Sequence, residues 1–309
     1  MKHAKRSGWR PFWAALCAAL LVLLPLVGGT VLLSRAQLRS SLRQAAKSQS
    51  GVPIRLPKAT DRCTVLLCVA DGNAKALLQS KEDDALVPSA NMVHLLQNGQ
   101  DSGMGAVVSV NDALRCFASP TSDIYLPLLK RVGTHTAFVG LALFDGGKMT
   151  ATANMADTFG ILLMNGKIKS GLLTLQNDKL GHIGVELVSC KVGTKSTIEN
   201  GRSVFRVTVQ AQLMLDEVQK GYISTIDNRS IAVIERLAEQ KLVDLCTGAY
   251  ACLQAAGCDG VQVGAQLAMA DPAGYAAVKA DWNRAFSASV IQAVCHCRIT
   301  KINDNSIRE

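Results

Sequence analysis

The chain has 309 residues, 49% of them hydrophobic and 18% charged, which is enough for a sizeable packed core and excludes a globally disordered protein. The net charge of +9 comes from the N-terminal part alone. Residues 1–60 contain ten Lys or Arg and neither Asp nor Glu, which leaves 23 basic and 24 acidic groups in residues 61–309. The folded part therefore carries no basic field for a phosphate backbone, and nucleic acid is excluded as a partner.

An uncharged stretch of 22 residues, Phe12–Leu33, predicts a membrane-spanning helix. Such a helix would be about 33 Å long, enough to cross a bilayer core. Basic residues are denser before it than after it, so we expect the N-terminus in the cytoplasm and the rest outside. The alternative is a signal peptide cleaved near Ser34-Arg35-Ala36, but the apolar stretch exceeds the ~7–15 residues of such signals. We predict an anchor over residues 1–34 and a basic linker over 35–60.

Residues 61–134 are predicted to form a small α/β middle domain. It opens with an apolar, β-prone run at Cys63–Ala70, and Asn73–Ser80 looks helical. A second helix, capped by Ser89 or Asn91, carries Met92, Leu95 and Leu96. A third helix covers Val110–Ala118, with Leu114 and Phe117 expected to point inward.

Residues 135–309 are predicted to form a larger α+β domain, beginning with strands. Turn sequences at Asp145–Lys148, Asn165–Lys167 and Asn200-Gly201 separate runs of apolar or alternating residues. The strands predicted from these runs are Thr136–Phe144, Ala156–Met164, Ser170–Gln176, Ile183–Val192 and Ser203–Leu215. The last two are long and alternate, which favours an antiparallel pair.

Helical signals dominate the rest of this domain. Asp227–Ala256 has one apolar face, and Gly257 is expected to end the helix. Asp271 and Pro272 fit the N-cap and first position of another helix. The apolar stripe of that helix is Tyr275, Val278, Trp282, Ala285 and Phe286. A Val- and Ile-rich strand then runs to Ile302. The sequence thus predicts an α+β fold, a mostly antiparallel sheet packed with helices and preceded by one transmembrane helix.

Ten cysteines raise the question of a metal site or disulfides. Cys246 and Cys252 are six residues apart and do not share a helical face, and no C-x-x-C pair occurs. On a strand, Cys295 and Cys297 would share one face while His296 points to the other. We therefore predict no metal site. Disulfides stay open, because an extracytoplasmic location would allow them.

No arrangement of residues predicts catalysis. The five His are scattered, and the sequence lacks the usual nucleophile, metallopeptidase and nucleotide-binding motifs. Asp83-Asp84 lies in a polar stretch typical of a solvated surface. Trp282 lies in an apolar helical stripe and is expected to be a core residue. We predict a protein that is not an enzyme, with no catalytic or metal residues and no cofactor.

The order of several weak motifs resembles one family. Ile231–Ile302 is similar to the C-terminal domain of the Ger(x)C family, the C subunits of bacterial spore nutrient-germinant receptors. The matching pieces are the long helix, the turn Gly257–Gly264 (GCDGVQVG), the helix with Pro272, Trp282 and Phe286, and the final strand. Upstream matches are Val69–Leu78, Pro88–Leu96, Tyr125–Pro127, Ala137-Phe138 and Gly171-Leu172. The resemblance covers roughly residues 61–305.

The resemblance implies a membrane-anchored, extracytoplasmic and non-enzymatic subunit of the inner spore membrane. It would assemble with the integral-membrane A and B receptor subunits and act in receptor assembly or signal relay. The chain departs from the family in a shortened N-terminal region and in lacking a lipoprotein signal, since Cys17 stands near the start of the apolar stretch. A spanning helix can replace the lipid. The alternative is an extracytoplasmic Cys-rich metal-binding or enzymatic domain.

Overall fold

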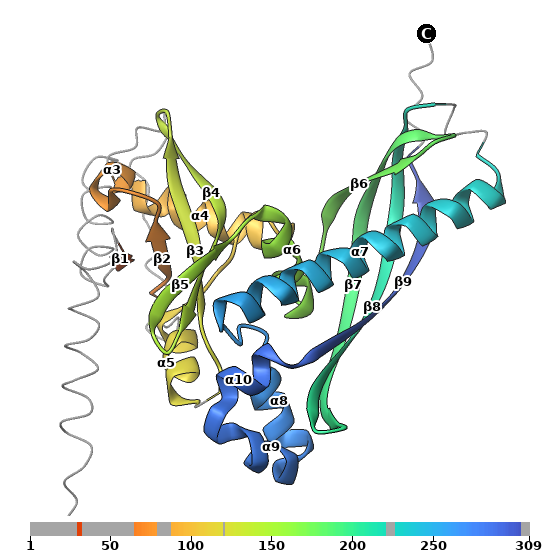
Figure 1. Ribbon diagram of the computed structural model, residues 1–309. Helices are drawn as coiled ribbons and strands as arrows, with labels where there is room; N and C mark the ends of the chain where they lie inside the picture. Colours follow the sequence, from red (N-terminus) through yellow and green to blue (C-terminus); the bar gives the residue numbers. More distant parts are fainter. Residues whose placement is uncertain (1–29, 33–64, 79–87, 120, 221–225, 304–309) are drawn as a thin grey trace, which may run out of the picture.

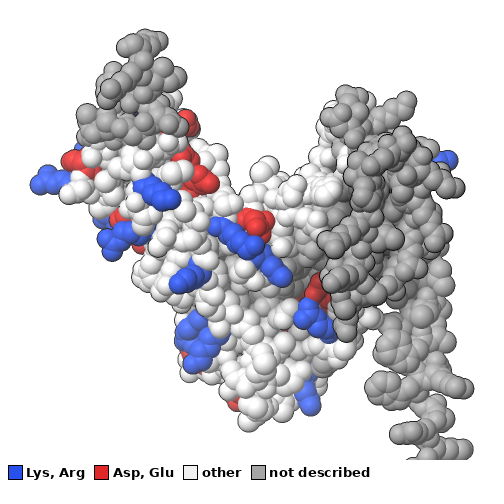
Figure 2. All heavy atoms as spheres, turned by 180° about the vertical axis from the view of Figure 1, so that it is seen from behind, with Lys and Arg blue, Asp and Glu red and all other residues white. Residues whose placement is uncertain are grey.

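The structure, a computed structural model, describes residues 30–32, 65–78, 88–119, 121–220 and 226–303. These residues form an α+β fold with two separate mixed sheets, each at the centre of one lobe (Figure 1). Helix α6 (Met155–Met164) lies between the lobes, and α7 (Asn228–Ala256) runs from α6 across the C-terminal sheet (Figure 1). Seen from the opposite side, the surface is hollowed between the two lobes (Figure 2). The sequence predicted the α+β class but described one sheet instead of two.

The N-terminal lobe is built on a five-stranded sheet with helices on both faces. The strands, in sheet order, are β1 (Thr30–Leu32), β2 (Leu67–Ala70), β3 (Tyr125–Val132), β4 (His135–Asp145) and β5 (Lys148–Ala153). Strands β2 and β3 are parallel, and the other neighbours are antiparallel. On one face, the short helix α3 (Ala74–Leu78), α4 (Pro88–Gln100) and α6 bury apolar residues against the sheet. Helix α5 (Val110–Ala118) covers the other face.

The N-terminal predictions are only partly within the described residues. Thr30–Leu32, at the end of the predicted membrane span, form strand β1 and pair with β2, whereas the rest of the span and the linker at 35–60 lie outside the described residues. No helix within the described ranges is both long and apolar enough to cross a membrane. The predicted domain boundary between residues 134 and 135 falls in the turn joining β3 to β4, so β4 and β5 complete the N-terminal sheet.

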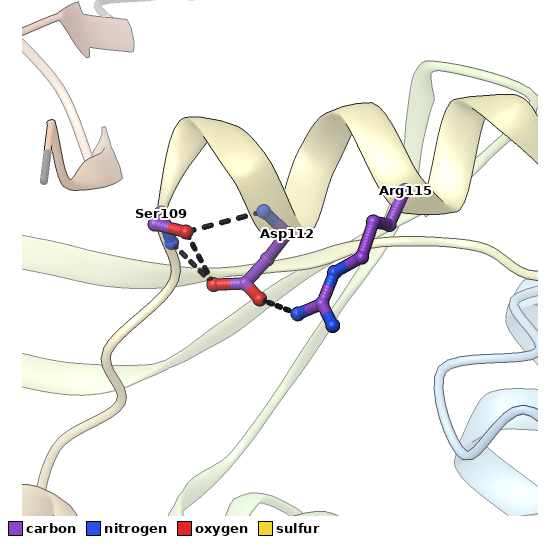
Figure 3. Close-up of polar contacts among 3 residues, drawn as sticks. All are labelled: Ser109, Asp112 and Arg115. Atoms are coloured by element: carbon purple, nitrogen blue, oxygen red, sulfur yellow. Dashed lines mark hydrogen bonds and ion pairs between the residues drawn. The ribbon is translucent and has the colours of Figure 1, made fainter.

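Helix α5 begins with a capping box, shown in Figure 3. The Ser109 hydroxyl accepts from the Asp112 backbone N–H at 3.1 Å, and the Asp112 carboxylate accepts from the Ser109 backbone N–H at 2.9 Å. Arg115 pairs with the other oxygen of Asp112. The buried face of this helix is Ala113, not the predicted Leu114 and Phe117; Phe117 is 41% exposed and lies over Gly147.

Removing the capping hydroxyl should weaken this face of the lobe. Ser109→Ala leaves the Asp112 N–H without its acceptor, and we expect a loss of about 1 kcal/mol in the free energy of unfolding. Urea denaturation of the purified protein measures it. The matched control is Asn111→Ala, an exposed position of the same helix, which should change stability by less than half as much.

The pH dependence of stability provides a second check on the capping box. Burial alone would raise the pKa of Asp112, but the hydrogen bonds from Ser109 and Arg115 outweigh it and lower that pKa. The stabilisation from this carboxylate is therefore present above its unfolded pKa and is lost as the pH falls through the folded pKa. An equal effect of Ser109→Ala at neutral pH and at pH values below both pKa values would contradict a contribution from the hydrogen bond that the Ser109 hydroxyl donates to the Asp112 carboxylate.

The C-terminal lobe is built on a four-stranded sheet of long strands. In sheet order they are β6 (Gly171–Asn177), β7 (Gly181–Glu199), β8 (Arg202–Val218) and β9 (Val290–Ile302). The predicted antiparallel pair is confirmed as β7 and β8, and β9 joins β8 in parallel. The crossover from α7 to β9 consists of α8 (Val263–Ala270), α9 (Pro272–Val278), the 3-10 helix η2 (Lys279–Asp281) and α10 (Trp282–Ser287).

Two helices of this region depart from or refine the predictions. The segment predicted as a strand at Ala156–Met164 is the helix α6, and that prediction is wrong. Asn154 caps this helix by accepting from the Asp157 N–H at 2.9 Å. The apolar run of α6 is buried along its whole length, so it shows no helical periodicity. The single helix predicted after Pro272 is instead split into α9, η2 and α10.

Helix α7 contacts both sheets. Its C-terminal half packs against α6, where Gly160 has no room for a side chain: a Cβ there would lie 2.2 Å from the Leu245 carbonyl oxygen. The Thr150 hydroxyl of β5 donates to the Ala256 carbonyl at 2.8 Å. The predicted stop at Gly257 is confirmed, with φ of 66°. The apolar face of α7 lies over the inner face of the C-terminal sheet.

Two glutamates of α7 close the open edge of that sheet. The Glu239 carboxylate accepts from the Cys297 backbone N–H at 3.0 Å, and Glu235, one turn earlier, accepts from the Ile299 N–H at 2.8 Å. These N–H groups belong to the edge strand β9 and point away from β8. An unpaired edge is a template for adding another strand. The helix therefore both covers the sheet and caps its edge.

Candidate functional site

The most chemically unusual group in the described residues is the fully buried carboxylate of Asp259. It lies in the turn between α7 and α8. One oxygen accepts from the Val263 N–H at 2.8 Å; the other accepts from the Gly264 N–H at 2.8 Å and from the Trp282 indole N–H at 3.2 Å. The carboxylate therefore caps the first turn of α8 and fixes the start of α10.

Two further aspartates join this turn to the N-terminal lobe. Asp123, just before β3, accepts from the Asp259 backbone N–H at 2.9 Å and from the Gly146 N–H at 3.2 Å. Asp145, at the end of β4, accepts from the Asn283 side-chain amide at 3.0 Å. We refer to Asp123, Asp145, Asp259, Trp282 and Asn283 as the Asp259 cluster. It ties the two lobes together through polar groups.

Burial dominates the electrostatics of the Asp259 cluster. It raises the pKa of Asp259 to about 7, although the Gly264 and Val263 N–H groups act in the opposite direction. Burial also raises the pKa of Asp123, and the Asp145 carboxylate adds to the rise, while the N–H groups of Asp259 and Gly146 lower it. Carboxylates with raised pKa values often mark functional sites, but hydrogen-bond networks with a purely structural role raise pKa values too.

A cavity of about 290 Å³ adjoins the cluster between α5, the β4–β5 turn and α10. Its wall includes Phe117, Asp123, Asp145, Gly147, Trp282 and Asn283. The carboxylate oxygens along it already accept backbone or amide N–H groups. No nucleophile paired with a base is found among the described residues that line it. The arrangement is suited to holding the lobes together, and it offers no evident chemistry on a substrate.

The cysteines and the histidine considered as metal ligands lie on α7 and β9. Cys295 and Cys297 are buried on the inner face of β9 and His296 is exposed on the other face, as expected from strand alternation. Cys246 is buried and Cys252 half-buried on α7, also as expected. Within the described ranges, no group of three or more His, Cys, Asp or Glu is placed to hold a metal ion. Asp83-Asp84 lies outside the described residues.

Trp282 is a core residue, as predicted, and also a hydrogen-bond donor. Its ring packs against Phe286, with centroids 6.2 Å apart, and Tyr250 meets the same Phe286 edge-on at 5.5 Å. The sequence did not single out Asp259, Asp123 or Asp145 as partners. One signal was available: Asp259 is the single charged residue between Leu245 and Ala270. An isolated charge in so apolar a stretch has to be buried with partners.

Comparison with known proteins identifies the two parts of the chain. Residues 59–131 match the family model of the spore germination protein N-terminal domain, and residues 139–303 match that of the Spore germination B3/GerAC-like C-terminal domain. A search of the curated proteins finds no significant match.

A solved structure shows the same fold. The chain is similar to the crystal structure of the GerBC protein, with a TM-score of 0.57 and 18% identity over 77% of this chain and 68% of that one. At this identity the likeness concerns the fold, which is two mixed sheets packed with helices. The C-terminal family model alone spans more than half of the sequence. The chain therefore belongs to the Ger(x)C family of spore germination proteins, as its motifs predicted.

Proposed function

We propose that the protein is a non-enzymatic subunit of a spore germinant receptor that acts in receptor assembly or signal relay. The observation that carries this proposal is the pair of family matches, which together cover both lobes in the order typical of the family. The resemblance to GerBC adds support from the fold.

The polar interior is consistent with a scaffold. Asp259, the carboxylate with the most strongly raised pKa, uses both of its oxygens to accept hydrogen bonds from N–H groups of its own chain. The Gln254 side chain likewise donates to the carbonyls of Phe286 and Ser289, at 3.0 and 2.9 Å, and so holds the entry to β9. Such groups position surfaces, and their hydrogen bonds leave no reacting atom poised for catalysis.

The partners and the location are part of the proposal. The part of the uncharged stretch that precedes β1, residues 12–29, would anchor the protein in the inner spore membrane, with residues 61–134 and 135–309 outside the cytoplasm. The integral-membrane A and B subunits would be its partners. The near-neutral balance of charges after residue 60 favours contacts through mixed polar and apolar surfaces over attraction to a polyanion.

Co-purification from spores tests the proposal. We expect the intact, affinity-tagged protein, extracted from spore inner membranes in mild detergent, to bring down two multi-span subunits in amounts comparable to its own. Recovery of the intact protein in the membrane fraction without any multi-span subunit would overturn the receptor assignment.

A matched variant separates anchoring from assembly. Replacing Leu21 and Leu24 by Lys puts two charges into the predicted span, each costing about 2.5–3.5 kcal/mol at the centre of a bilayer. The variant should leave the membrane fraction when expressed without the A and B subunits. Unchanged membrane association of that variant would contradict the predicted anchor and would leave the receptor assignment to the co-purification.

A further inference from the structure

The outer face of the C-terminal sheet carries two adjacent rows of hydrogen-bond donors. Side chains alternate between the faces along each strand, so β7, β8 and β9 each contribute one residue to a row. The first row is Lys191, Gln210 and His296, and the second is Ser189, Gln212 and Arg298. We call these six residues the donor grid. All six are exposed, and Figure 2 shows basic side chains scattered over this side of the lobe.

The donor grid forms most of the wall of an open pocket of about 470 Å³. Small-molecule sites usually have volumes of about 300–1,000 Å³. Each of the six side chains can donate a hydrogen bond, and those of Lys191 and Arg298 can only donate. Within the described residues, none of the six side chains takes part in a hydrogen bond or an ion pair. The pocket therefore presents donors that the chain itself leaves unused.

The donor grid is small and sharply bounded. On one side, the next row is Gly193, Thr208 and Val294, of which Val294 is 50% exposed. On the other side, the next row contains Glu186 opposite Met214. With strands about 4.8 Å apart and a two-residue repeat of about 6.7 Å, the donor grid spans about 10 Å by 7 Å. A long polyanion would run from it onto an apolar row or a carboxylate, so the dimensions favour a small ligand.

The positive charges stand at opposite corners of the donor grid. Lys191 lies on β7 in one row, and Arg298 lies on β9 in the other. A guanidinium group binds a carboxylate or a phosphate through two parallel hydrogen bonds, and an ammonium group acts as a point charge. Between them, the amides of Gln210 and Gln212 can donate to polar atoms that link two anionic groups. This arrangement favours a ligand with two anionic groups over a single ion.

Two carboxylates at the rim of the pocket limit where an anion can lie. Glu235 and Glu239 line the pocket and accept from the Ile299 and Cys297 N–H groups at the edge of β9, at 2.8 and 3.0 Å. Their charge repels an anion held directly over that edge. We therefore expect the ligand to lie over β7 and β8, with Arg298 reaching inward from β9.

We propose that the donor grid is a binding site for a small molecule with two anionic groups, carboxylate or phosphate. Binding is non-covalent and uses side chains of three neighbouring strands, including β9, the strand whose edge α7 holds. The site goes beyond receptor assembly and signal relay and does not rest on them, because every residue of the donor grid belongs to the C-terminal sheet.

Isothermal titration calorimetry of the intact protein in an uncharged detergent tests the site. The probes are citrate and inorganic pyrophosphate, titrated separately at constant ionic strength, because salt screens diffuse attraction. We expect saturable binding of at least one probe, and the tighter of the two identifies the preferred anionic group. Acetate, with one carboxylate, should bind about tenfold more weakly or worse. Absence of saturable binding of both probes at millimolar concentration would overturn the proposal.

Variants at exposed positions assign the binding to the donor grid. Lys191→Gln and Arg298→Gln should each weaken binding about tenfold, because each removes a charge-assisted hydrogen bond. Gln212→Ala should weaken it about threefold although no charge changes. The matched control is Lys195→Gln, exposed on the same face of β7 but outside the donor grid, with an expected change below about twofold. Equal losses from Lys191→Gln and Lys195→Gln would mean diffuse attraction to a basic face and would contradict a defined site.

A lipid headgroup is the competing source of an anionic group. Mixed micelles containing phosphatidylglycerol are therefore the third probe. Binding of these micelles that Lys191→Gln weakens, without binding of citrate or pyrophosphate, would overturn the small-molecule site. The purified protein needs neither the A nor the B subunit for these measurements, so a negative result here leaves the receptor assignment to the co-purification experiment, and failed co-purification leaves the titrations valid.

Discussion

Asp259→Ala should destabilise the protein by about 3–5 kcal/mol, more than any other side-chain truncation in the polar interior. The change removes the acceptor for the Val263 and Gly264 N–H groups and for the Trp282 indole, and leaves all three buried. The hydrogen bond from the backbone N–H of residue 259 to Asp123 stays, because the substitution removes only the side chain. Urea denaturation at neutral pH measures the loss. We expect the C-terminal crossover, from α8 to α10, to lose protection from hydrogen exchange before the sheets do.

Asp271→Ala is the matched control for this experiment. Asp271 also caps a helix, accepting from the Gly274 N–H at 2.8 Å, but its side chain is only half-buried. Its loss should cost about 1 kcal/mol. An equal loss of stability from the two substitutions would mean that the burial of Asp259 does not increase the cost of removing its carboxylate.

The pH dependence of stability gives Asp259 a signature of its own. Burial raises its folded pKa to about 7, so between the unfolded pKa of a carboxyl group and that value the folded protein binds the extra proton. Its contribution is therefore largest at acid pH and declines as the pH rises toward 7. This decline should be absent from Asp259→Asn. A variant that keeps the wild-type slope in this window would show that other groups cause it.

Gly160→Ala should cost about 2–4 kcal/mol even though alanine is the better helix former. The new methyl group would lie 2.2 Å from the Leu245 carbonyl oxygen and 2.5 Å from the Ala249 Cβ. One of these contacts is with backbone, which cannot turn aside, so α6 and α7 have to separate. Thermal unfolding measures the loss. The near-ultraviolet circular dichroism spectrum should also change if the separation of the helices reaches Tyr250.

Gly248→Ala is the control, because it makes the same change on the facing helix. A Cβ at Gly248 meets only the Asp157 carboxylate, at an ordinary 3.8 Å. This substitution should leave stability unchanged or raise it by up to about 1 kcal/mol through helix propensity. A similar loss from both substitutions would contradict the close approach at Gly160.

The sequence best predicted those helices and strands whose hydrophobic period and terminal residues can both be recognised. The apolar stripe of helix α7 and its stop at Gly257 were both predicted, and the structure confirms them. The β7–β8 pair alternates along its length and turns at Asn200-Gly201. Local signals were sufficient here because each element buries one face only.

The prediction failed where an element is buried on every side. Helix α6 is apolar along Ile161–Met164, and such a run fits a buried strand as well as a buried helix. The Asn154 cap, which the predictions from sequence did not include, is the local feature that marks this segment as a helix. The division into two sheets was also missed, because no local pattern tells which strands share a sheet.

The Asp259 cluster could not be predicted for a related reason. Its three aspartates, Asp123, Asp145 and Asp259, come from separate segments that are more than a hundred residues apart at the extremes. Only the packing of the two lobes brings them together. The lone charge at Asp259 would have indicated a buried partner, but not which one. The family resemblance located the turn without giving the role of its aspartate.

Helix α7 has a mechanical consequence. Its 29 residues make a rod about 43 Å long. Near its C-terminus, α7 accepts a hydrogen bond from Thr150 of β5 and packs against Gly160 of α6. Near its N-terminus, Glu235 and Glu239 accept hydrogen bonds from the edge strand of the C-terminal sheet. Along its length the helix also lies on the C-terminal sheet. A tilt of the N-terminal lobe relative to that sheet would therefore strain the contacts at the C-terminal end of α7 first, while Glu235 and Glu239 keep the other end on the sheet.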